Sequence, residues 1–394
     1  MNVTQEYKQT EFGPIPSDWI LCTFQDVLAT FSSGATPYRG IPEYYKGNVR
    51  WISSGELNYN KIFDTIEHIS QQAVKNTNLR VHQPGTFLMA ITGLEAEGTR
   101  GRCAFVGAPA TTNQSCLAIN GTERMCTEYL YWFYRMWGQY LAFKYCQGTK
   151  QQSYTANIVR NLPIYGPKDI FEQKAIAEAL NDIDGLIAVL DKKIAKKRLI
   201  KQGTMQQLLM GKKRLPGFTD PWVEKKLGEI LDYEQPQPYL VVSTDYVDSG
   251  IPVLTAGKSL VLGYTAEQFG VYNKLPVIIF DDFTTDSKYI SHPFKVKSSA
   301  MKMLSLKNND YDLRLVYELM QQIDFPLKDH QRYWISEYSQ LTISLPKDKE
   351  EQTAIATILS DMDKEIADLE AKRNKYRLLK SGIMQKLLTG QIRL

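Results

Sequence analysis

The sequence contains few of the residues that bind metal ions. Its 394 residues include only five cysteines and four histidines. All five cysteines lie within the first 146 positions, and no two form the Cys-x-x-Cys pair that structural zinc sites commonly use. The sequence therefore predicts no metal site. An odd number of scattered cysteines is instead typical of reduced thiols in a cytosolic protein.

Long apolar segments are also missing. The sequence has no run of 18 apolar residues, which is about the shortest run that a membrane-spanning helix requires. The first residues, MNVTQEYKQTEFGPIP, lack the apolar core of a secretory signal. We therefore expect a soluble, cytoplasmic protein.

The common catalytic motifs are absent as well. The Gly-Lys pairs at 211–212 and 257–258 lack the glycine that begins a P-loop five positions earlier. Residues 370–372 (EAK) match the E-x-K of some nucleases, but they fall within a helical pattern and have no catalytic aspartate upstream. Residues 235–239 (QPQPY) lack the leading asparagine of the adenine-methyltransferase motif NPPY. The sequence therefore predicts no catalytic residue and no bound cofactor.

The size of the chain and the placement of its charge are informative. A chain of 394 residues exceeds what one hydrophobic core usually organises, so two or more domains are expected. Residues 191–214 contain nine Lys or Arg and one acidic residue, whereas the net charge of the whole chain is only +4. This segment indicates either a polyanionic or acidic partner, or a solvated face of a helix.

An internal repeat organises the chain. Residues 167–215 align with residues 346–394 at a constant offset of 179 without a gap, and 27 of the 49 positions are identical. Both copies carry apolar residues at alternating steps of three and four, which is the heptad pattern of a coiled coil. We therefore predict two long helices that pack on each other, rather than two helices docked separately on their own domains. The predicted seam consists of Ile176, Leu180, Ile183, Ile187, Leu190, Ile194, Ile355, Leu359, Met362, Ile366 and Leu369.

Each helix is preceded by a variable segment. Both segments begin with a tryptophan, Trp19 or Trp222, followed by hydrophobic residues at identical spacing. Residues 20–160 and 223–340 otherwise share almost no sequence, and both are rich in Gly, Pro, Thr, Tyr and β-branched runs typical of mixed α/β domains. One frame that carries two different inserts indicates recognition of two different targets.

Several motifs within the inserts resemble a known family. Residues 33–58 (SGATPYRGIPEYYKGNVRWISSGELN), 84–102 and 112–114 are similar to the target-recognition motifs of Type I restriction-modification specificity subunits. Residues 251–264, 277–283 and 296–300 are similar to a second subclass of the same domain. Two such domains alternating with two copies of one helix make the resemblance specific over nearly the whole chain.

The resemblance implies a function and a set of partners. Each target-recognition domain would read one half of a split, asymmetric target in double-stranded DNA within the nucleoid of a bacterium or archaeon. The helices would act as a spacer and as a docking surface for two methyltransferase subunits that bind S-adenosylmethionine and modify adenine. Restriction and motor subunits, with ATP and Mg²⁺, would join through the methyltransferase core. The chain itself would be non-catalytic and serve DNA methylation and antiviral defence.

These observations define an α/β (α+β) chain with pseudo-two-fold symmetry. We predict target-recognition domains at 1–165 and 216–345, and spacer helices at 166–215 and 346–394 that form an antiparallel coiled coil. Two other classes remain open. They are the recognition part of a single-chain restriction endonuclease-methyltransferase and a structural coiled-coil scaffold, and co-purification with a partner or activity of the isolated chain would distinguish them.

Candidate DNA contacts are polar or aromatic residues in the predicted loops, because such side chains match base edges and phosphates. In the first domain they are Thr36, Tyr38, Arg39, Ser54, Glu56, Thr92, Arg100, Arg102, Asn113, Gln114, Lys150, Gln151, Gln152 and Tyr154. In the second domain they are Lys258, Tyr264, Asp282, Thr284, Thr285, Lys288, Lys297, Ser298, Ser299, Arg332 and Tyr333.

Overall fold

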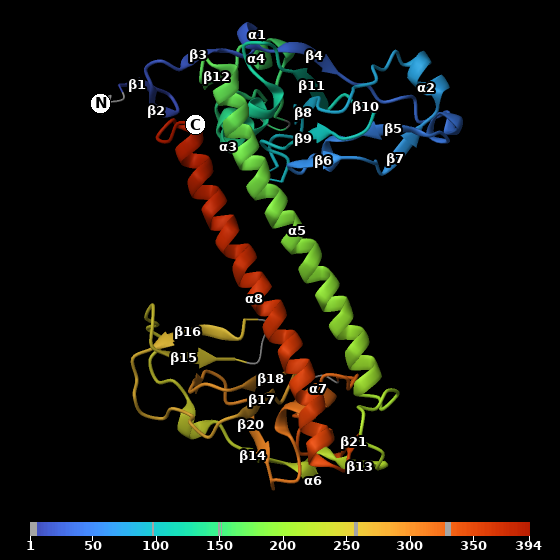
Figure 1. Ribbon diagram of the computed structural model, residues 1–394, viewed down its shortest axis with the longest axis vertical. Coiled ribbons are helices and arrows are strands. Elements are labelled where there is room, and N and C mark those ends of the chain that lie inside the picture. Colours follow the sequence, from blue (N-terminus) through green and yellow to red (C-terminus); the bar gives the residue numbers. More distant parts are fainter. Residues whose placement is uncertain (1–5, 97, 149, 151, 256–258, 328–331) are drawn as a thin grey trace. The chain divides into compact units, whose positions relative to one another are not determined.

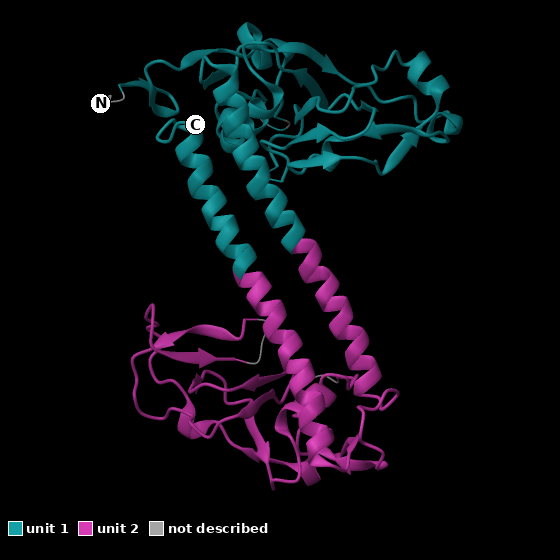
Figure 2. Cartoon of the chain, viewed as in Figure 1, with its two compact units in different colours: residues 1–190, 372–394 teal, residues 191–371 magenta. Residues whose placement is uncertain are grey.

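The computed structural model describes residues 6–96, 98–148, 150, 152–255, 259–327 and 332–394 (Figure 1). The chain divides into two compact units, Met1–Leu190 with Lys372–Leu394 and Asp191–Ala371 (Figure 2). Each unit combines helices and sheets with part of each of two long helices, which confirms the predicted α+β class. In the part of the chain that the structure describes, no helix is both long and apolar enough to span a membrane.

The long helices are α5 (Ile170–Leu208) and α8 (Lys349–Leu388), of 39 and 40 residues. Both lie within the segments predicted to be helical. Of the eleven predicted seam residues, Ile183, Met362, Ile366 and Leu369 are half-buried and the other seven are buried. The end of the seam nearest each domain has a second role, because Ile176 and Leu180 belong to one domain core and Ile355 and Leu359 to the other.

Ion pairs show that the two helices run antiparallel within each unit. In the first unit, Lys380 of α8 bonds to Asp184 of α5, and Arg393, just past the end of α8, bonds to Glu172 near the start of α5. Increasing residue numbers in one helix therefore meet decreasing numbers in the other. The second unit follows the same rule with Lys197–Glu365 and Lys201–Asp363. The prediction of an antiparallel pair is confirmed.

The first unit contains twelve strands among its described residues. They are β1 (Tyr7–Thr10), β2 (Gly13–Pro16), β3 (Ile20–Thr23), β4 (Ala29–Ser33), β5 (Val49–Ile52), β6 (Asn60–Ile62), β7 (Glu67–Ile69), β8 (Phe87–Ala90), β9 (Cys103–Val106), β10 (Ala110–Thr112), β11 (Cys116–Asn120) and β12 (Pro163–Gly166). Its shorter helices are α1 (Phe24–Val27), α2 (Gln71–Asn76), α3 (Thr127–Tyr145) and α4 (Ala156–Arg160), with 3₁₀ turns η1 (Pro42–Tyr45) and η2 (Ser54–Glu56).

The second unit contains nine strands among its described residues. They are β13 (Trp222–Lys226), β14 (Leu231–Glu234), β15 (Ile251–Leu254), β16 (Val261–Thr265), β17 (Val277–Asp281), β18 (Ser287–Ile290), β19 (Lys295–Val296), β20 (Met301–Leu306) and β21 (Thr342–Pro346). Its shorter helices are α6 (Leu227–Ile230) and α7 (Leu313–Met320), with 3₁₀ turns η3 (Gln237–Tyr239) and η4 (Tyr338–Gln340).

The two domains share one strand plan, although their inserts share almost no sequence. The order β4-β11-β8-β9 in the first unit corresponds to β14-β20-β17-β18 in the second, and every neighbouring pair in both is antiparallel. A smaller sheet, β10-β5-β7, likewise corresponds to β19-β15-β16, with one parallel and one antiparallel pairing in each. The pairs β3–β12 and β13–β21 complete the shared frame. The two units therefore share the central part of their sheets, whereas β6 and the β1–β2 pair of the first unit have no counterpart among the described strands of the second.

The core of the first domain lies between its sheet and α3. The consecutive α3 residues from Tyr129 to Tyr134 are all buried, because α3 packs on β8 and β9 of the sheet and is also bonded to α5 and β12. The second domain is smaller and has two clusters, one around α7 and one between its two sheets. The frame strands β12 and β21 end at Gly166 and Pro346, each one residue beyond the predicted domain boundary.

Candidate nucleic-acid interface

Strand order gathers most of the predicted contact loops at one end of the first domain's main sheet. In an antiparallel sheet, the end of one strand lies beside the start of its neighbour. Ser33 at the end of β4 pairs with Leu117 in β11, Cys116 pairs with Ala90 at the end of β8, and β9 begins at Cys103. The loops at residues 34–41, 91–102 and 113–115 therefore emerge together. These loops carry Thr36, Tyr38, Arg39, Thr92, Arg100, Arg102, Asn113 and Gln114.

The predicted cluster at residues 150–154 joins the same sheet end. Thr92 forms a bridge with Ser153, and the backbone N–H of Leu94 donates to the carbonyl of Gln152 at 3.0 Å. The Gln152 N–H in turn donates to the Glu95 carboxylate at 2.8 Å. Segments that are about 60 residues apart in the sequence thus form one surface. Gln151 lies outside the described residues.

The loop at residues 34–41 is held in a fixed conformation. A side chain at Gly34 would place its Cβ 1.8 Å from the Thr112 carbonyl oxygen, so only glycine allows this close approach. The Trp51 indole donates to the Ala35 carbonyl at 3.1 Å, and the Tyr45 hydroxyl donates to the Pro37 carbonyl at 2.5 Å. A loop anchored at three points loses little conformational entropy on binding a ligand.

Arg39 and Tyr38 lie at the tip of this loop and differ in role. The Arg39 guanidinium forms two hydrogen bonds to Glu67, at 2.6 and 2.8 Å, and lies over the ring of Tyr45 at 4.3 Å. The hydrogen bond from Arg39 is the main reason that the pKa of Glu67 is lowered. Tyr38 is 74% exposed and is therefore available to a ligand, whereas Arg39 is already engaged.

The second domain presents the corresponding sheet end. Asp281 at the end of β17 pairs with Met301 at the start of β20, and β18 begins at Ser287. Segment 332–334 is attached to the β17–β18 turn, because the Trp334 N–H donates to the Asp282 carboxylate at 2.8 Å. The predicted residues gathered here are Asp282, Thr284, Thr285, Lys288, Lys297, Ser298, Ser299, Arg332 and Tyr333, whereas Tyr264 lies on β16 of the smaller sheet.

Three of the predicted contacts are buried side chains. Tyr154 is 4% exposed, Asp282 is 2% exposed and Tyr333 is fully buried. Asp282 forms an ion pair with the equally buried Lys302 at 3.1 Å and fixes the neighbouring segment through its backbone bonds. These three side chains are therefore covered in this structure, and their contact with DNA stays a prediction. Lys258 lies outside the described residues.

Other predicted residues are exposed in part but support their own loops. The Glu56 carboxylate accepts the N–H groups of Ser53 and Ile66, which fixes η2 and its first residue Ser54. Arg100 donates to two loop carbonyls at 2.9 and 3.1 Å, and Arg102 donates to Asn58. Glu56, Arg100 and Arg102 therefore stabilise the conformations of the loops that carry them.

Two exposed aromatic residues at these surfaces were not predicted. Phe283 is 45% exposed in the β17–β18 turn, with the Arg332 guanidinium 5.8 Å from its ring. Phe143 is 77% exposed near the end of α3, with Arg100 at 6.0 Å. An aromatic residue within a polar turn, as in DDFTTD, was the signal available for Phe283. Across the described ranges, no three His, Cys, Asp or Glu side chains gather as metal ligands.

Comparison with known proteins identifies the class. Residues 16–197 and 219–376 match the model of the Type I restriction modification DNA specificity domain, so each half of the chain carries one such domain. Two DNA-specificity domains joined by long helices define a specificity subunit. The chain belongs to the family of Type I restriction-modification specificity subunits.

Individual relatives match over part of their length. The chain is 44% identical over 182 residues to the EcoR124I/EcoR124II specificity subunit of Escherichia coli, covering 43% of this chain and 45% of that protein. It is 33% identical over 133 residues to the MjaIX specificity subunit of Methanocaldococcus jannaschii, covering 33% of this chain and 29% of that protein. These matches thus span less than half the length of either relative.

A solved structure shares the fold over nearly the whole chain. The S subunit of a Type I restriction-modification system from M. genitalium superposes with a TM-score of 0.70, covering 98% of this chain and 99% of that one. The two sequences are 15% identical, so the likeness concerns the fold alone.

Proposed function

We propose that the chain reads a bipartite, asymmetric DNA target, with one half-site read by each unit. The observation that carries this proposal is the repeated strand plan with different loops. Both units gather loops at the same end of the same sheet, yet the residues in those loops differ almost completely. A shared frame supports a common way of approaching DNA, and different loop residues support different base preferences.

The proposal includes partner subunits that supply the chemistry. Two methyltransferase subunits would dock on the long helices and bind S-adenosylmethionine, and motor and restriction subunits would supply ATP- and Mg²⁺-dependent steps. Equivalent apolar residues in the two copies of the repeat support two equal partner sites. These residues are Leu199 and Ile200 in α5, and Leu378 and Leu379 in α8, all of which are exposed.

The first experiment tests whether the halves read DNA independently. The chain is expressed with its partner subunits, and methylome sequencing defines the target. Alanine at both Asn113 and Gln114 should then relax one half-site only, and alanine at both Thr284 and Lys297 should relax only the other. Loss of a base contact costs about 1–3 kcal/mol, so the discrimination at an affected position should fall roughly 5- to 150-fold. Relaxation of both half-sites by one pair of substitutions would contradict independent reading.

The second experiment tests the division of labour. The purified chain, incubated with DNA, S-adenosylmethionine, ATP and Mg²⁺, should neither methylate nor cut the DNA. Adding the partner methyltransferase should restore methylation, and the complex should contain about two copies of it per chain by native mass spectrometry. Methylation by the chain alone would instead support a single-chain endonuclease-methyltransferase.

A further inference from the structure

Two aspartates at equivalent positions of the repeat, Asp184 and Asp363, make the same pair of contacts. Asp184 Oδ2 accepts from Arg135 at 2.7 Å, and its Oδ1 accepts from Lys380. Asp363 Oδ2 accepts from an arginine at 2.6 Å, and its Oδ1 accepts from a lysine at 2.5 Å. In this second cluster the arginine is Arg314 and the lysine is Lys201. In both copies of the repeat, one carboxylate oxygen of the aspartate therefore accepts from an arginine and the other from a lysine.

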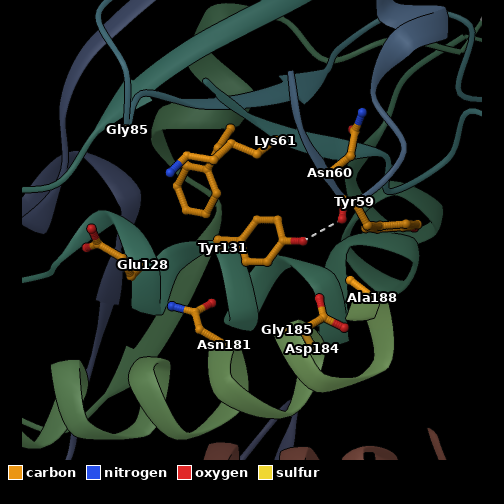
Figure 3. Close-up of a pocket in the computed structure, with 11 residues that line it drawn as sticks. Tyr59, Asn60, Lys61, Gly85, Glu128, Tyr131, Asn181, Asp184, Gly185 and Ala188 are labelled. Atoms are coloured by element: carbon orange, nitrogen blue, oxygen red, sulfur yellow. Dashed lines mark hydrogen bonds between the residues drawn. The ribbon is translucent and has the colours of Figure 1, made fainter. Parts of the chain in front are cut away.

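Each aspartate connects three different parts of its unit. Asp184 lies on α5, Arg135 on α3 of the recognition domain, and Lys380 on α8. Figure 3 shows Asp184 on α5 beside the domain residues Tyr59 and Tyr131, at the wall of a cavity of about 590 Å³. In the second unit the aspartate is on α8, the arginine on α7 and the lysine on α5. Both clusters are therefore three-way junctions between a domain and the two long helices.

Because these side chains are partly buried, their contacts favour one alignment of the domain and the two helices over others. The side chains of the first junction are 13–32% exposed and those of the second 18–38%. Burial alone would raise the pKa of Asp184, but the hydrogen bond from Lys380 and the charge of Arg135 outweigh it and lower that pKa. Removing a partner from a partly desolvated charge is costly, so the favoured arrangement is the one that keeps all three groups together.

The apolar seam does not provide the same selectivity. Its residues recur every three or four positions, and an aliphatic seam shifted by one heptad again places aliphatic residues opposite each other. A polar group at one level specifies alignment, because a shift separates it from its partner. The arginine extends this effect to the domain, since it requires α3 or α7 to lie at one level along the helix pair.

We propose that Asp184 and Asp363 are positioning residues that fix each recognition domain on the helix pair and thereby set the length of unread DNA that the complex accepts between its half-sites. This inference rests on the proposed bipartite target. The half-sites themselves are read by the loops, so weakening the junctions changes which spacing is accepted and leaves the preferred bases unchanged.

The experiment compares spacer lengths rather than overall activity. The complex of the chain with its partner subunits is prepared with wild-type chain and with the double variant Asp184→Asn, Asp363→Asn. Binding is measured on synthetic duplexes that carry both half-sites with the native spacer, or with one base pair more or fewer. We expect native-spacer affinity within about threefold of wild type, and the ratio of altered-spacer to native-spacer affinity to rise about tenfold.

A matched control separates the junctions from ordinary helix contacts. Glu365→Gln removes the Lys197–Glu365 ion pair at 2.7 Å, which joins α5 to α8 without involving a domain residue. This variant should keep the wild-type spacer preference. If circular dichroism shows that the double aspartate variant is unfolded, the pair Lys380→Gln, Lys201→Gln is measured instead, because it keeps both Asp–Arg contacts and breaks the bond to the other long helix.

The outcomes separate the positioning role of the two aspartates from the proposed bipartite target. A folded junction variant with an unchanged spacer ratio overturns the positioning role while leaving the bipartite target intact. Equal relaxation in the Glu365→Gln control also overturns it, because any helix contact would then suffice. A wild-type complex that binds a single half-site as tightly as the full target overturns the proposed function itself.

Discussion

Gln173 offers a test of how each domain is attached to its long helix. Its side chain is fully buried and makes three hydrogen bonds of 2.9 Å. The amide oxygen accepts from the N–H of Cys126, the N-cap residue of α3, and the amide nitrogen donates to the carbonyls of Arg124 and Pro167. In the other copy of the repeat, Gln352 accepts from the N-cap N–H of α7 and donates to the equivalent proline carbonyl.

Replacing Gln173 by leucine keeps the volume of the side chain and removes all three bonds. The buried Cys126 N–H and Pro167 carbonyl then lose their partner, and each such group costs about 1–3 kcal/mol. Allowing for the apolar gain of leucine, we expect the first unit to lose about 3 kcal/mol of unfolding free energy. That is a large share of the roughly 5–15 kcal/mol that stabilises a typical domain.

The assay is urea unfolding of the full chain, followed by the fluorescence of Trp132, which is buried in α3 of the first unit. Other tryptophans are replaced by phenylalanine in the reference chain. Gln352→Leu should leave this transition nearly unchanged, since its bonds lie in the second unit, and Gln202→Leu on the exposed surface of α5 serves as the control. A loss below about 1 kcal/mol for Gln173→Leu would refute the reasoning, because it would mean that the orphaned backbone groups find other partners.

Two further predictions concern pH and helix length. Burial is the first cause that lowers the pKa of His82 to about 4 in the folded chain, from an ordinary 6.5, so the unfolded chain binds the proton first as pH falls. The contribution of His82 to the free energy of unfolding should therefore be complete above about pH 6.5 and should decline toward pH 4 by up to about 3 kcal/mol. Over that range the thermal midpoint of His82→Gln should fall less than that of the wild type. An equal fall in both would contradict this role of His82. Inserting four helical residues after Leu190, and four after Ala371, should lengthen each helix by about 6 Å. Methylome sequencing of the active insertion variant should find the same half-sites with one or two more base pairs between them, and an unchanged spacer would show that the helices do not set the distance.

The repeat and its heptads were sufficient to predict two long helices that pack on each other, whereas the heptads alone do not fix the direction of the pairing. They could not show that the two inserts share a strand plan, because that plan depends on the order of short apolar strands and not on residue identity. β8 reads FLMA and β17 reads VIIFD, and each is fully or almost fully buried. Strands with such different residues occupy the same place in the two sheets, since any apolar residue of suitable size satisfies a buried strand.

For the candidate site, the sequence was sufficient to predict which loops take part but not which of their side chains are exposed. Loop position could be inferred from turn residues and motifs, and the structure brings most of those loops to one sheet end in each unit. Burial of individual polar residues could not be inferred, because it depends on a partner supplied by a neighbouring strand. Asp282 is tolerated inside the domain because β20 places Lys302 3.1 Å away and the Trp334 N–H donates to its other oxygen, and neither contact is visible in the sequence.

Two ion pairs join the beginning of each copy of the repeat to the end of the other copy, and they limit how the sequence can vary. Glu172 is bonded to Arg393 and Glu351 to Arg214, so each glutamate depends on the arginine from the other copy of the repeat. At these positions, a change of charge in one copy of the repeat leaves a residue of the other copy without its partner. A substitution at position 172 acts on a partner 221 positions away, and one at 351 acts on a partner 137 positions away, so we expect correlated changes at these two pairs to cross between the copies.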